Sequence, residues 1–367
     1  EAESFPLIAS SAINENGRET MTDIYIHVGT HKTGSTTIQH ALRDTSRANP
    51  EEGWIYSGTT AIAKEIMRAK QYDKTLVQRF KVEVQNMMKR AKSANRVILS
   101  SEALSGLPND GYQNSNTVFS MLRDATNKYN TKIIIFLRRQ DSFLESMYTQ
   151  KIHEGENLEF ESFLKQYNLP DALNYRRMLN ELSACFGDQN LIVRSYHESS
   201  KIGLLADFGE IIGSKSLRYS EQGEKNPGYS RHALEIAKIC NRSLDQSRKR
   251  QLRKALQAVM AKNRLEPFSY FTNDERTKFL NRYQVSNREV ANRYFGGDLE
   301  RLFPTPQSSK LISHNESLTY EEVAGLLVQI LNENPSNSGS GFIAGIRVTL
   351  SGYPRLRRLI QKVRRRV

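Results

Sequence analysis

The sequence predicts an α/β protein in which a central parallel β-sheet is flanked by helices. Short, continuously apolar runs alternate with longer segments whose apolar residues recur three or four positions apart, as buried strands and amphipathic helices do. The first apolar run leads through a glycine-containing loop into a helical segment, which is how a β-loop-α unit begins. This alternation along the chain favours a parallel sheet over an all-β or all-α architecture.

The elements follow one another at regular intervals. Apolar runs predict strands over Ile24–Val28, Gly53–Gly58, Arg96–Glu102, Lys132–Arg138 and Asn190–Tyr196. Helical spacing predicts helices from Ile38 onward and over Lys74–Lys92, Asn116–Tyr129, Asp171–Cys185, Ile202–Ile212, Ala233–Asn241, Arg242–Arg264 and Glu321–Leu331. In open parallel sheets ligands bind beyond the carboxyl ends of the strands, so residues that follow the strands are candidates for a site.

Composition and patterning predict three regions: an N-terminal extension over 1–22, one domain over 23–333, and a linker and tail over 334–367. The chain of 367 residues is 38% hydrophobic and 25% charged, as expected of a globular protein. No run approaches the ~20 apolar residues that span a bilayer. The two cysteines, Cys185 and Cys240, form no disulfide framework, so we expect a cytoplasmic location.

The positive charge is concentrated at the C-terminus. Between Asn334 and Val367 there are eight Arg or Lys residues and no Asp or Glu, against a net charge of +13 for the whole chain. The remaining residues are therefore only mildly basic, which suits anionic ligands and gives no reason to expect nucleic acid.

The segment Ile24–Gln39 has the composition of an anion-binding loop. Gly29 and Gly34 stand at the spacing of the P-loop pattern, G-x-x-x-x-G-K-[ST], but Ser35 occupies the lysine position and Lys32 lies inside the loop. Backbone N–H groups and the dipole of the following helix favour negative charge at such a point. A lysine moved into the loop indicates a shorter anion than a nucleoside triphosphate.

A second motif closes the strand at Lys132–Arg138. Arg138 ends the strand, and Ser146 lies eight residues later on the following helix. An arginine offers a fork of donors that matches a phosphate, and a serine adds a hydroxyl donor.

Together the two motifs resemble those of sulfotransferases that use 3′-phosphoadenosine 5′-phosphosulfate (PAPS). K-T-G-S-T-T at Lys32–Thr37 is similar to the family's 5′-phosphosulfate loop, and Arg138 with Ser146 resembles its 3′-phosphate segment, although Arg139-Gln140 replaces the Asn-Pro of many members. The resemblance implies a P-loop-NTPase-like sulfotransferase fold and transfer of a sulfuryl group from PAPS to a hydroxyl or amine. It implies that PAPS is bound by Lys32, Thr33, Gly34, Ser35, Thr36, Thr37, Arg138 and Ser146, with a weaker carry-over to Asn226 and Ser230 in a late loop.

Such a transfer needs a base for the acceptor's proton. Glu102, just past a strand end, is our first candidate, and a helix-capping or salt-bridged carboxylate is the alternative. Lys32 is expected to stabilise the leaving phosphate, and His31 in the same loop is a rival base. His27 lies inside the strand, where a core histidine is expected. No cluster with metal-ligand spacing is present in the sequence, so we expect no metal.

Two other classes stay open: a nucleotide-dependent kinase or NTPase on the same fold, and a non-catalytic nucleotide-binding or membrane-surface module. The sequence does not name the acceptor: saccharides, lipids, peptides and small phenols stay open, and a saccharide or glycolipid is the expectation. Pro354–Val367 places apolar residues on one helical face and basic residues on the other. This pattern predicts peripheral contact with an anionic membrane; the alternatives are that the helix packs back on the domain or that the tail is disordered and solvated.

Overall fold

The computed structural model describes most of the chain. The described residues are 12–13, 19–20, 22–58, 61–91, 94–169, 171–217, 229–242, 244–261, 268–305 and 312–313. The predicted helix at Glu321–Leu331, the linker, the basic tail and the loop residue Asn226 lie outside them.

The chain divides into two compact units. The first takes its described residues from Glu1–Arg139, Tyr167–Glu221 and Tyr283–Thr305, and the second takes its own from Gln140–Gln166, Gln222–Arg282 and Pro306–Val367. The sequence predicted one domain over 23–333, and the division inside that range depends on contacts between distant segments.

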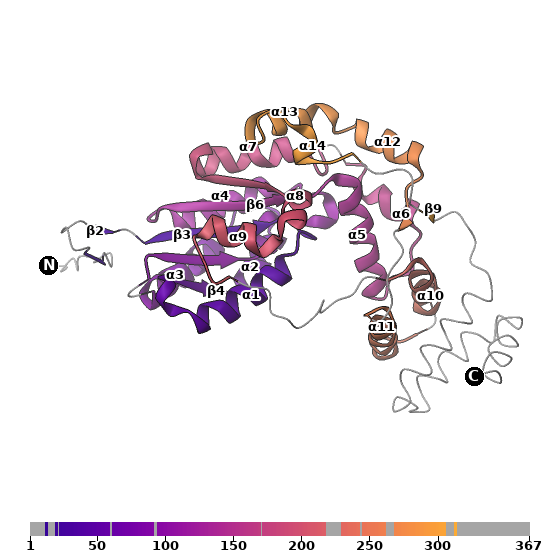
Figure 1. Ribbon diagram of the computed structural model, residues 1–367, viewed down its shortest axis with the longest axis horizontal. Helices are drawn as coiled ribbons and strands as arrows, with labels where there is room; N and C mark the ends of the chain where they lie inside the picture. The colour runs from indigo at the N-terminus through magenta and orange to yellow at the C-terminus, as the bar shows by residue number, and fades with distance from the viewer. Residues whose placement is uncertain are drawn as a thin grey trace, which may run out of the picture. The chain divides into compact units, whose positions relative to one another are not determined.

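The first unit contains a five-stranded parallel sheet, so the predicted α/β fold class is confirmed (Figure 1). Its strands are ordered β4-β5-β3-β6-β7, with every neighbouring pair parallel. The bounds are β3 Asp23–Gly29, β4 Trp54–Ser57, β5 Arg96–Ser100, β6 Thr131–Leu137 and β7 Leu191–Ser195.

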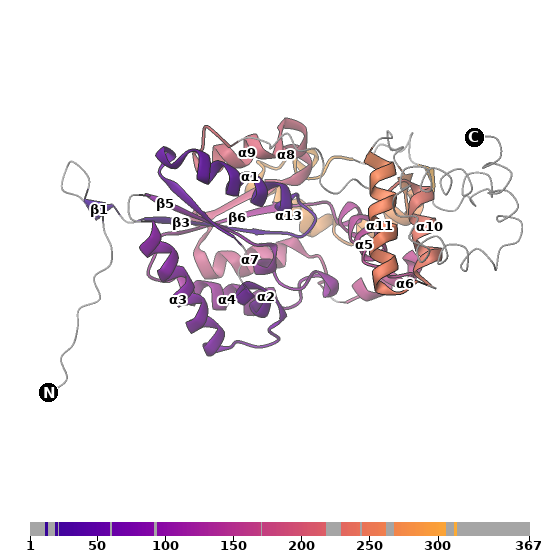
Figure 2. The ribbon, with the colours of Figure 1, turned by 90° about the horizontal axis from the view of Figure 1, so that it is seen from below.

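The central strand β3 is paired along both of its edges, and helices cover both faces of the sheet (Figure 2), so its side chains are buried. Ile24, Ile26 and Val28 are at most 2% exposed. β3 pairs Ile26 with Leu99 of β5 and with Ile133 of β6. The register shifts between His27 and Gly29, directly before the glycine loop.

Helices cover both faces of this sheet, as Figure 2 shows with α1, α8 and α9 on one side and α3, α4 and α7 on the other. Ile38 and Leu42 of α1 pack with Leu205 and Phe208 of α9 in one apolar cluster, which also contains Phe136 of β6. The helices of this unit are α1 Ser35–Ala48, α2 Ala61–Arg68, α3 Lys74–Arg90, α4 Ser115–Thr126, α7 Tyr175–Phe186, α8 Tyr196–Ile202, α9 Leu204–Ile212, α13 Gln284–Tyr294 and α14 Leu299–Leu302.

The second unit is mainly helical in its described part. Its helices are α5 Gln140–His153, α6 Phe160–Leu164, α10 Arg231–Asn241, α11 Gln246–Ala261 and α12 Asn273–Asn281. The short strand β8, Phe268–Ser269, pairs in parallel with β9, Ile312–Ser313. The first unit also contains a separate antiparallel pair of short strands, β1 Ala12–Ile13 and β2 Glu19–Thr20.

Several predicted boundaries were wrong by a few residues; the helix expected over Asp171–Cys185, for example, is Tyr175–Phe186. Two further differences concern residues on which the site depends. The helix expected over Ile202–Ile212 is two helices, because Gly203 takes φ 104° and interrupts the backbone between α8 and α9. The strand expected over Arg96–Glu102 ends at Ser100, and Glu102 instead begins a short 3-10 turn, Glu102–Ser105.

Candidate active site

The predicted residues of the first unit gather at one edge of the sheet. The loop at Lys32 follows β3, Glu102 follows β5, and Arg138 follows β6. Since these strands are parallel and adjacent, their carboxyl ends lie side by side. This edge is where ligands bind in open α/β sheets.

The loop between β3 and α1 is held in a fixed shape by short hydrogen bonds. The backbone N–H and the hydroxyl of Thr30 both donate to the Phe136 carbonyl of β6, each at 3.1 Å. The buried Thr33 hydroxyl donates to the Thr30 carbonyl at 2.6 Å. Lys32 takes φ 64°, a left-handed conformation that is strained for a residue with a side chain.

The N-terminus of α1 is available to an anion. Its N-cap is Gly34, no side chain caps it, and its first turn contains no acidic residue. The first intrahelical bond to the N-cap runs from the Ile38 N–H to the Gly34 carbonyl, so the preceding N–H groups of the first turn have no acceptor within the helix. Ser35 is buried, Thr37 is half-buried and Thr36 is exposed. Such a helix end favours a phosphate-like group.

Both loop glycines are required by close approaches as well as by their positive φ angles. A Cβ on Gly29 would lie 3.1 Å from the Glu102 Cβ. A Cβ on Gly34 would lie 2.3 Å from Cδ2 of Leu204, the first residue of α9. The loop therefore lies directly against Glu102 on one side and against α9 on the other.

Arg138 braces this loop. Its Nη1 donates to the Lys32 carbonyl at 2.7 Å, and its guanidinium lies 5.2 Å from the centre of the Tyr196 ring. Its own carbonyl accepts from the Tyr175 hydroxyl at 2.7 Å. The structure thus brings the first motif and the arginine of the second together. Ser146 lies half-buried on α5 of the second unit, so its pairing with Arg138 stays a prediction.

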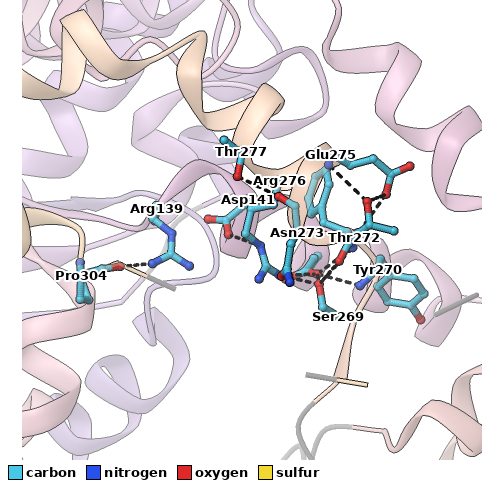
Figure 3. Close-up of polar contacts among 12 residues, drawn as sticks. Arg139, Asp141, Ser269, Tyr270, Thr272, Asn273, Glu275, Arg276, Thr277 and Pro304 are labelled. Atoms are coloured by element: carbon cyan, nitrogen blue, oxygen red, sulfur yellow. Dashed lines mark hydrogen bonds and ion pairs between the residues drawn. The ribbon is translucent and has the colours of Figure 1, made fainter. Parts of the chain in front are cut away.

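Arg139, which departs from the family pattern, ties the end of β6 to two other segments. Its backbone N–H donates to Nε2 of His197 on α8 at 3.1 Å. Its guanidinium donates to the Pro304 carbonyl, just after α14, as Figure 3 shows. This side chain therefore helps to hold the strand end that presents Arg138.

Glu102 is held by residues of α1. Gln39 donates its side-chain N–H to the Glu102 carboxylate at 2.8 Å, and the Ser35 hydroxyl bonds to it as well. Burial raises the pKa of Glu102, but its own backbone N–H, the neighbouring His31 and these two side chains outweigh burial and leave the pKa below its usual value. Glu102 is therefore a carboxylate at neutral pH.

His31 and His27 differ in their surroundings. The backbone N–H of His31 donates to the Tyr112 hydroxyl at 3.0 Å, and its Nδ1 lies 3.3 Å from the same oxygen. His27 is fully buried between Phe136 and Phe208, with Nδ1 2.8 Å from the Ser100 hydroxyl and with Nε2 lacking a hydrogen-bond partner among the described residues. Burial lowers the pKa of each to about 4, so both rings are neutral at pH 7.

No family model matches the chain. A protein of Archaeoglobus fulgidus described as "Uncharacterized protein" is 29% identical over 206 residues, which are 54% of this chain and 54% of that protein. The chain thus matches about half the length of this curated relative. Among solved structures, a sulfotransferase from Alicyclobacillus acidocaldarius is similar at 14% identity and a TM-score of 0.37, over 59% of this chain and 92% of that one. Retinol dehydratase, in complex with androsterone and inactive cofactor PAP, is similar at 13% identity and a TM-score of 0.31, over 72% and 80% of the two chains.

Ser230 and Asn226 are the two late-loop residues that the resemblance adds to the donor-binding set. Ser230 caps α10, where its hydroxyl accepts from the Ala233 N–H at 3.2 Å. A capping serine is a complete structural role, so a ligand contact of Ser230 stays a prediction. Asn226 is not among the described residues.

Three further residues of this edge were not predicted: Gln39, Tyr112 and Tyr196. Gln39 follows Ser35 by four positions on a helix, so helical spacing alone could have placed both on the face that meets Glu102. Tyr112 reaches His31 across 81 residues of sequence, and Tyr196 reaches Arg138 from a different strand end. The sequence contains no signal for contacts of that range.

Two general properties bear on the site. Within the described ranges, no three His, Cys, Asp or Glu side chains gather in a way that could hold a metal ion. In the same part of the chain, none of the helices combines the length and the apolar character needed to cross a membrane.

Proposed function

We propose that the protein is a PAPS-dependent sulfotransferase, which moves a sulfuryl group to a hydroxyl or amine of an acceptor. The observation that carries the proposal is the hydrogen bond from Arg138 to the carbonyl of Lys32. It joins the two sequence motifs at the carboxyl edge of a parallel sheet, beside a helix N-terminus that no side chain caps.

The residues at this edge fit the phosphosulfate end of such a donor. The loop Lys32–Thr37 offers one cation, hydroxyl groups and N–H groups of the first turn of α1. In the proposal these groups hold the 5′ end, while Arg138 and Ser146, with Asn226 and Ser230, hold the 3′-phosphate. PAPS, when bound, supplies the activated sulfuryl group.

The chain's own residues then have distinct tasks. Lys32 and the N–H groups of α1 stabilise negative charge that develops on the leaving phosphate. Glu102, a carboxylate at neutral pH, accepts the proton of the acceptor hydroxyl. Its lowered pKa makes it a weak base, so this assignment requires a hydrogen bond to the acceptor in the bound state. His31 is neutral at pH 7 and is the alternative proton acceptor.

A nucleotide-dependent kinase or NTPase is the second candidate, because Gly29 and Gly34 keep the P-loop spacing. The residue at the lysine position argues against it. A kinase of this pattern uses a lysine there to bridge the terminal phosphates, and the uncharged hydroxyl of Ser35 cannot supply that charge. A non-catalytic nucleotide-binding module is the third candidate.

The class of acceptor is inferred from the sequence. We propose a saccharide or glycolipid, reached in the cytoplasm, with peripheral contact between the basic C-terminal tail and an anionic membrane. No role for nucleic acid is proposed, since the chain outside the tail is only mildly basic.

The test is sulfate incorporation from ³⁵S-labelled PAPS into saccharide and lipid extracts. Wild-type protein and the Lys70→Ala variant, which removes an exposed lysine of the same unit, should label a product equally. Lys32→Ala should label it at least about 100-fold more slowly, the scale for losing a group that stabilises developing charge. Binding of PAPS without transfer to any acceptor would favour the non-catalytic module, and magnesium-dependent ATP turnover would favour the kinase.

A further inference from the structure

A buried ion cluster lies in the second unit and joins two carboxylates of α5 to one arginine of α12. Nε of Arg276 is 3.0 Å from Oδ2 of Asp141, and its Nη2 is 3.4 Å from Oε1 of Glu145. The side chains of Asp141, Arg276 and Glu145 are 0%, 6% and 20% exposed. Figure 3 shows Arg276 linked to Asp141 on one side and to Ser269 on the other.

Further donors fix Glu145 from the segment that precedes α12. Its Oε1 accepts from the Ser269 hydroxyl at 2.5 Å and from the Tyr270 N–H at 2.8 Å. A capping box between Thr272 and Glu275 fixes the first turn of α12, and Arg276 directly follows Glu275. The segment 269–276 thus holds α5 by several bonds to one carboxylate.

The electrostatics make Arg276 the key member of this cluster. Asp141 and Glu145 are four residues apart on one helix, so they share a face and repel each other when both are charged. Burial raises the pKa of Glu145, while Ser269 and the charge of Arg276 oppose that rise. Without Arg276 the two carboxylates would lose a shared cation in a place with little access to water.

The carboxylates of this cluster lie close to the second motif in the sequence. In the sequence Asp141 stands three residues after Arg138 and Glu145 immediately precedes Ser146, so the cluster fixes the part of α5 that carries Ser146. We propose that Arg276 is a positioning residue that sets the N-terminal turns of α5, and with them Ser146, for the 3′-phosphate of the donor. This inference rests on the proposed function.

The test compares adenosine 3′,5′-bisphosphate with adenosine 5′-phosphate by calorimetry. Arg276→Met should weaken binding of the bisphosphate about tenfold and leave that of the monophosphate within about twofold, because only the former has a 3′-phosphate to misplace. Arg276→Lys keeps the charge but loses the planar fork, so it should retain part of the wild-type preference for the bisphosphate. It replaces the Met variant in the comparison if that variant does not fold.

Lys238→Met is the matched control. Lys238 is 6% exposed in the same unit and lies 2.7 Å and 3.2 Å from Glu159 and Glu235, so it too is a buried cation shared by two carboxylates. Its loss should lower stability without changing the ratio of the two affinities.

Two readouts separate positioning from general damage. Adding Glu145→Gln to Arg276→Met removes the repulsion and should restore at least half of the lost preference for the bisphosphate. Lowering the pH should act in the same direction on Arg276→Met, because burial raises the pKa of Glu145 and protonation of this carboxylate removes the same repulsion.

Each negative outcome has one meaning. If wild type prefers the bisphosphate and both Arg276 variants prefer it equally, the positioning role is wrong while the proposed function stands. The same conclusion follows if Lys238→Met changes the ratio as much as Arg276→Met does. If wild type itself does not distinguish the two nucleotides, the proposed function fails and this inference fails with it.

Discussion

At the scale of single residues, Glu102 is the candidate general base on which the proposed chemistry depends most. Its hydrogen bonds with Ser35 and Gln39 connect the candidate base directly to the helix whose N-terminus is the candidate anion site. The carboxylate is therefore fixed relative to the loop before any ligand binds. A fixed base loses little freedom when the acceptor arrives, which is one way in which a group of low basicity still contributes to the rate.

We predict that Glu102→Gln keeps donor binding and loses turnover. The amide preserves the size of the side chain and its bond to Gln39, but it cannot accept a proton, so the rate of sulfuryl transfer should fall by about 10²–10⁴-fold. The affinity for adenosine 3′,5′-bisphosphate, measured by calorimetry, should change by less than about threefold, because no donor contact is assigned to this side chain. A rate near that of wild type would assign the base to His31.

At the scale of elements, the loop between β3 and α1 combines two kinds of constraint. Position 34 has a left-handed backbone, and Leu204 of α9 occupies the space in which a Cβ would lie, so both constraints require glycine. The geometry of the anion site thus depends on the packing of α9, an element that begins 170 positions later in the chain.

We predict that Gly34→Ala lowers stability and nucleotide affinity together. The left-handed conformation costs about 1–2 kcal/mol for alanine, and the contact with Leu204 adds to it. Gly296→Ala is the control, because Gly296 has φ 63° but nothing within 4 Å of the new Cβ, so it should show the backbone cost alone in urea unfolding. Adding Leu204→Ala to Gly34→Ala should recover some affinity; equal losses in the single and double variants would mean that the Leu204 contact is irrelevant.

The sequence predicted the elements of this edge well because their signals are local. Apolar runs marked all five strands of the sheet, and the glycine loop marked the start of α1. The wrong predictions have equally local causes: Gly203 divides a predicted helix into two, and Glu102 begins a 3-10 turn instead of extending β5. The contacts that complete the site, such as Tyr112 with His31 and Arg138 with Lys32, join residues 81 and 106 positions apart, and no single segment encodes them.

At the scale of the whole molecule, the division into two units was not predictable from composition. Both units contain ordinary amphipathic helices, and the chain passes between them at Arg139 and again at Tyr167 without a linker-like segment. The residues that tie the second unit together, Asp141, Glu145 and Arg276, are charged, and a sequence pattern would place them on the surface.

We predict that the folded protein loses stability between pH 6.5 and 4. Burial lowers the pKa of His27 and His31 to about 4, so the unfolded chain binds protons in this window that the folded protein does not. The stabilisation is fully present above pH 6.5 and is lost as the pH falls to 4, by about 3 kcal/mol for the fully buried His27 alone. The free energy of unfolding of His27→Gln, measured in urea, should decline less steeply over this window, and a slope equal to that of wild type would contradict the assignment.

The central claim is that this edge of the sheet binds a nucleotide by its 3′-phosphate as well as by its 5′ end. The most direct measurement is the affinity of the wild-type protein for adenosine 3′,5′-bisphosphate, adenosine 5′-phosphate and ATP, each with and without magnesium. We expect the bisphosphate to bind at least about tenfold more tightly than the monophosphate, a difference of about 1.4 kcal/mol, whether or not magnesium is present. Equal affinity for the bisphosphate and the monophosphate, or tightest binding of ATP only in the presence of magnesium, would contradict the account.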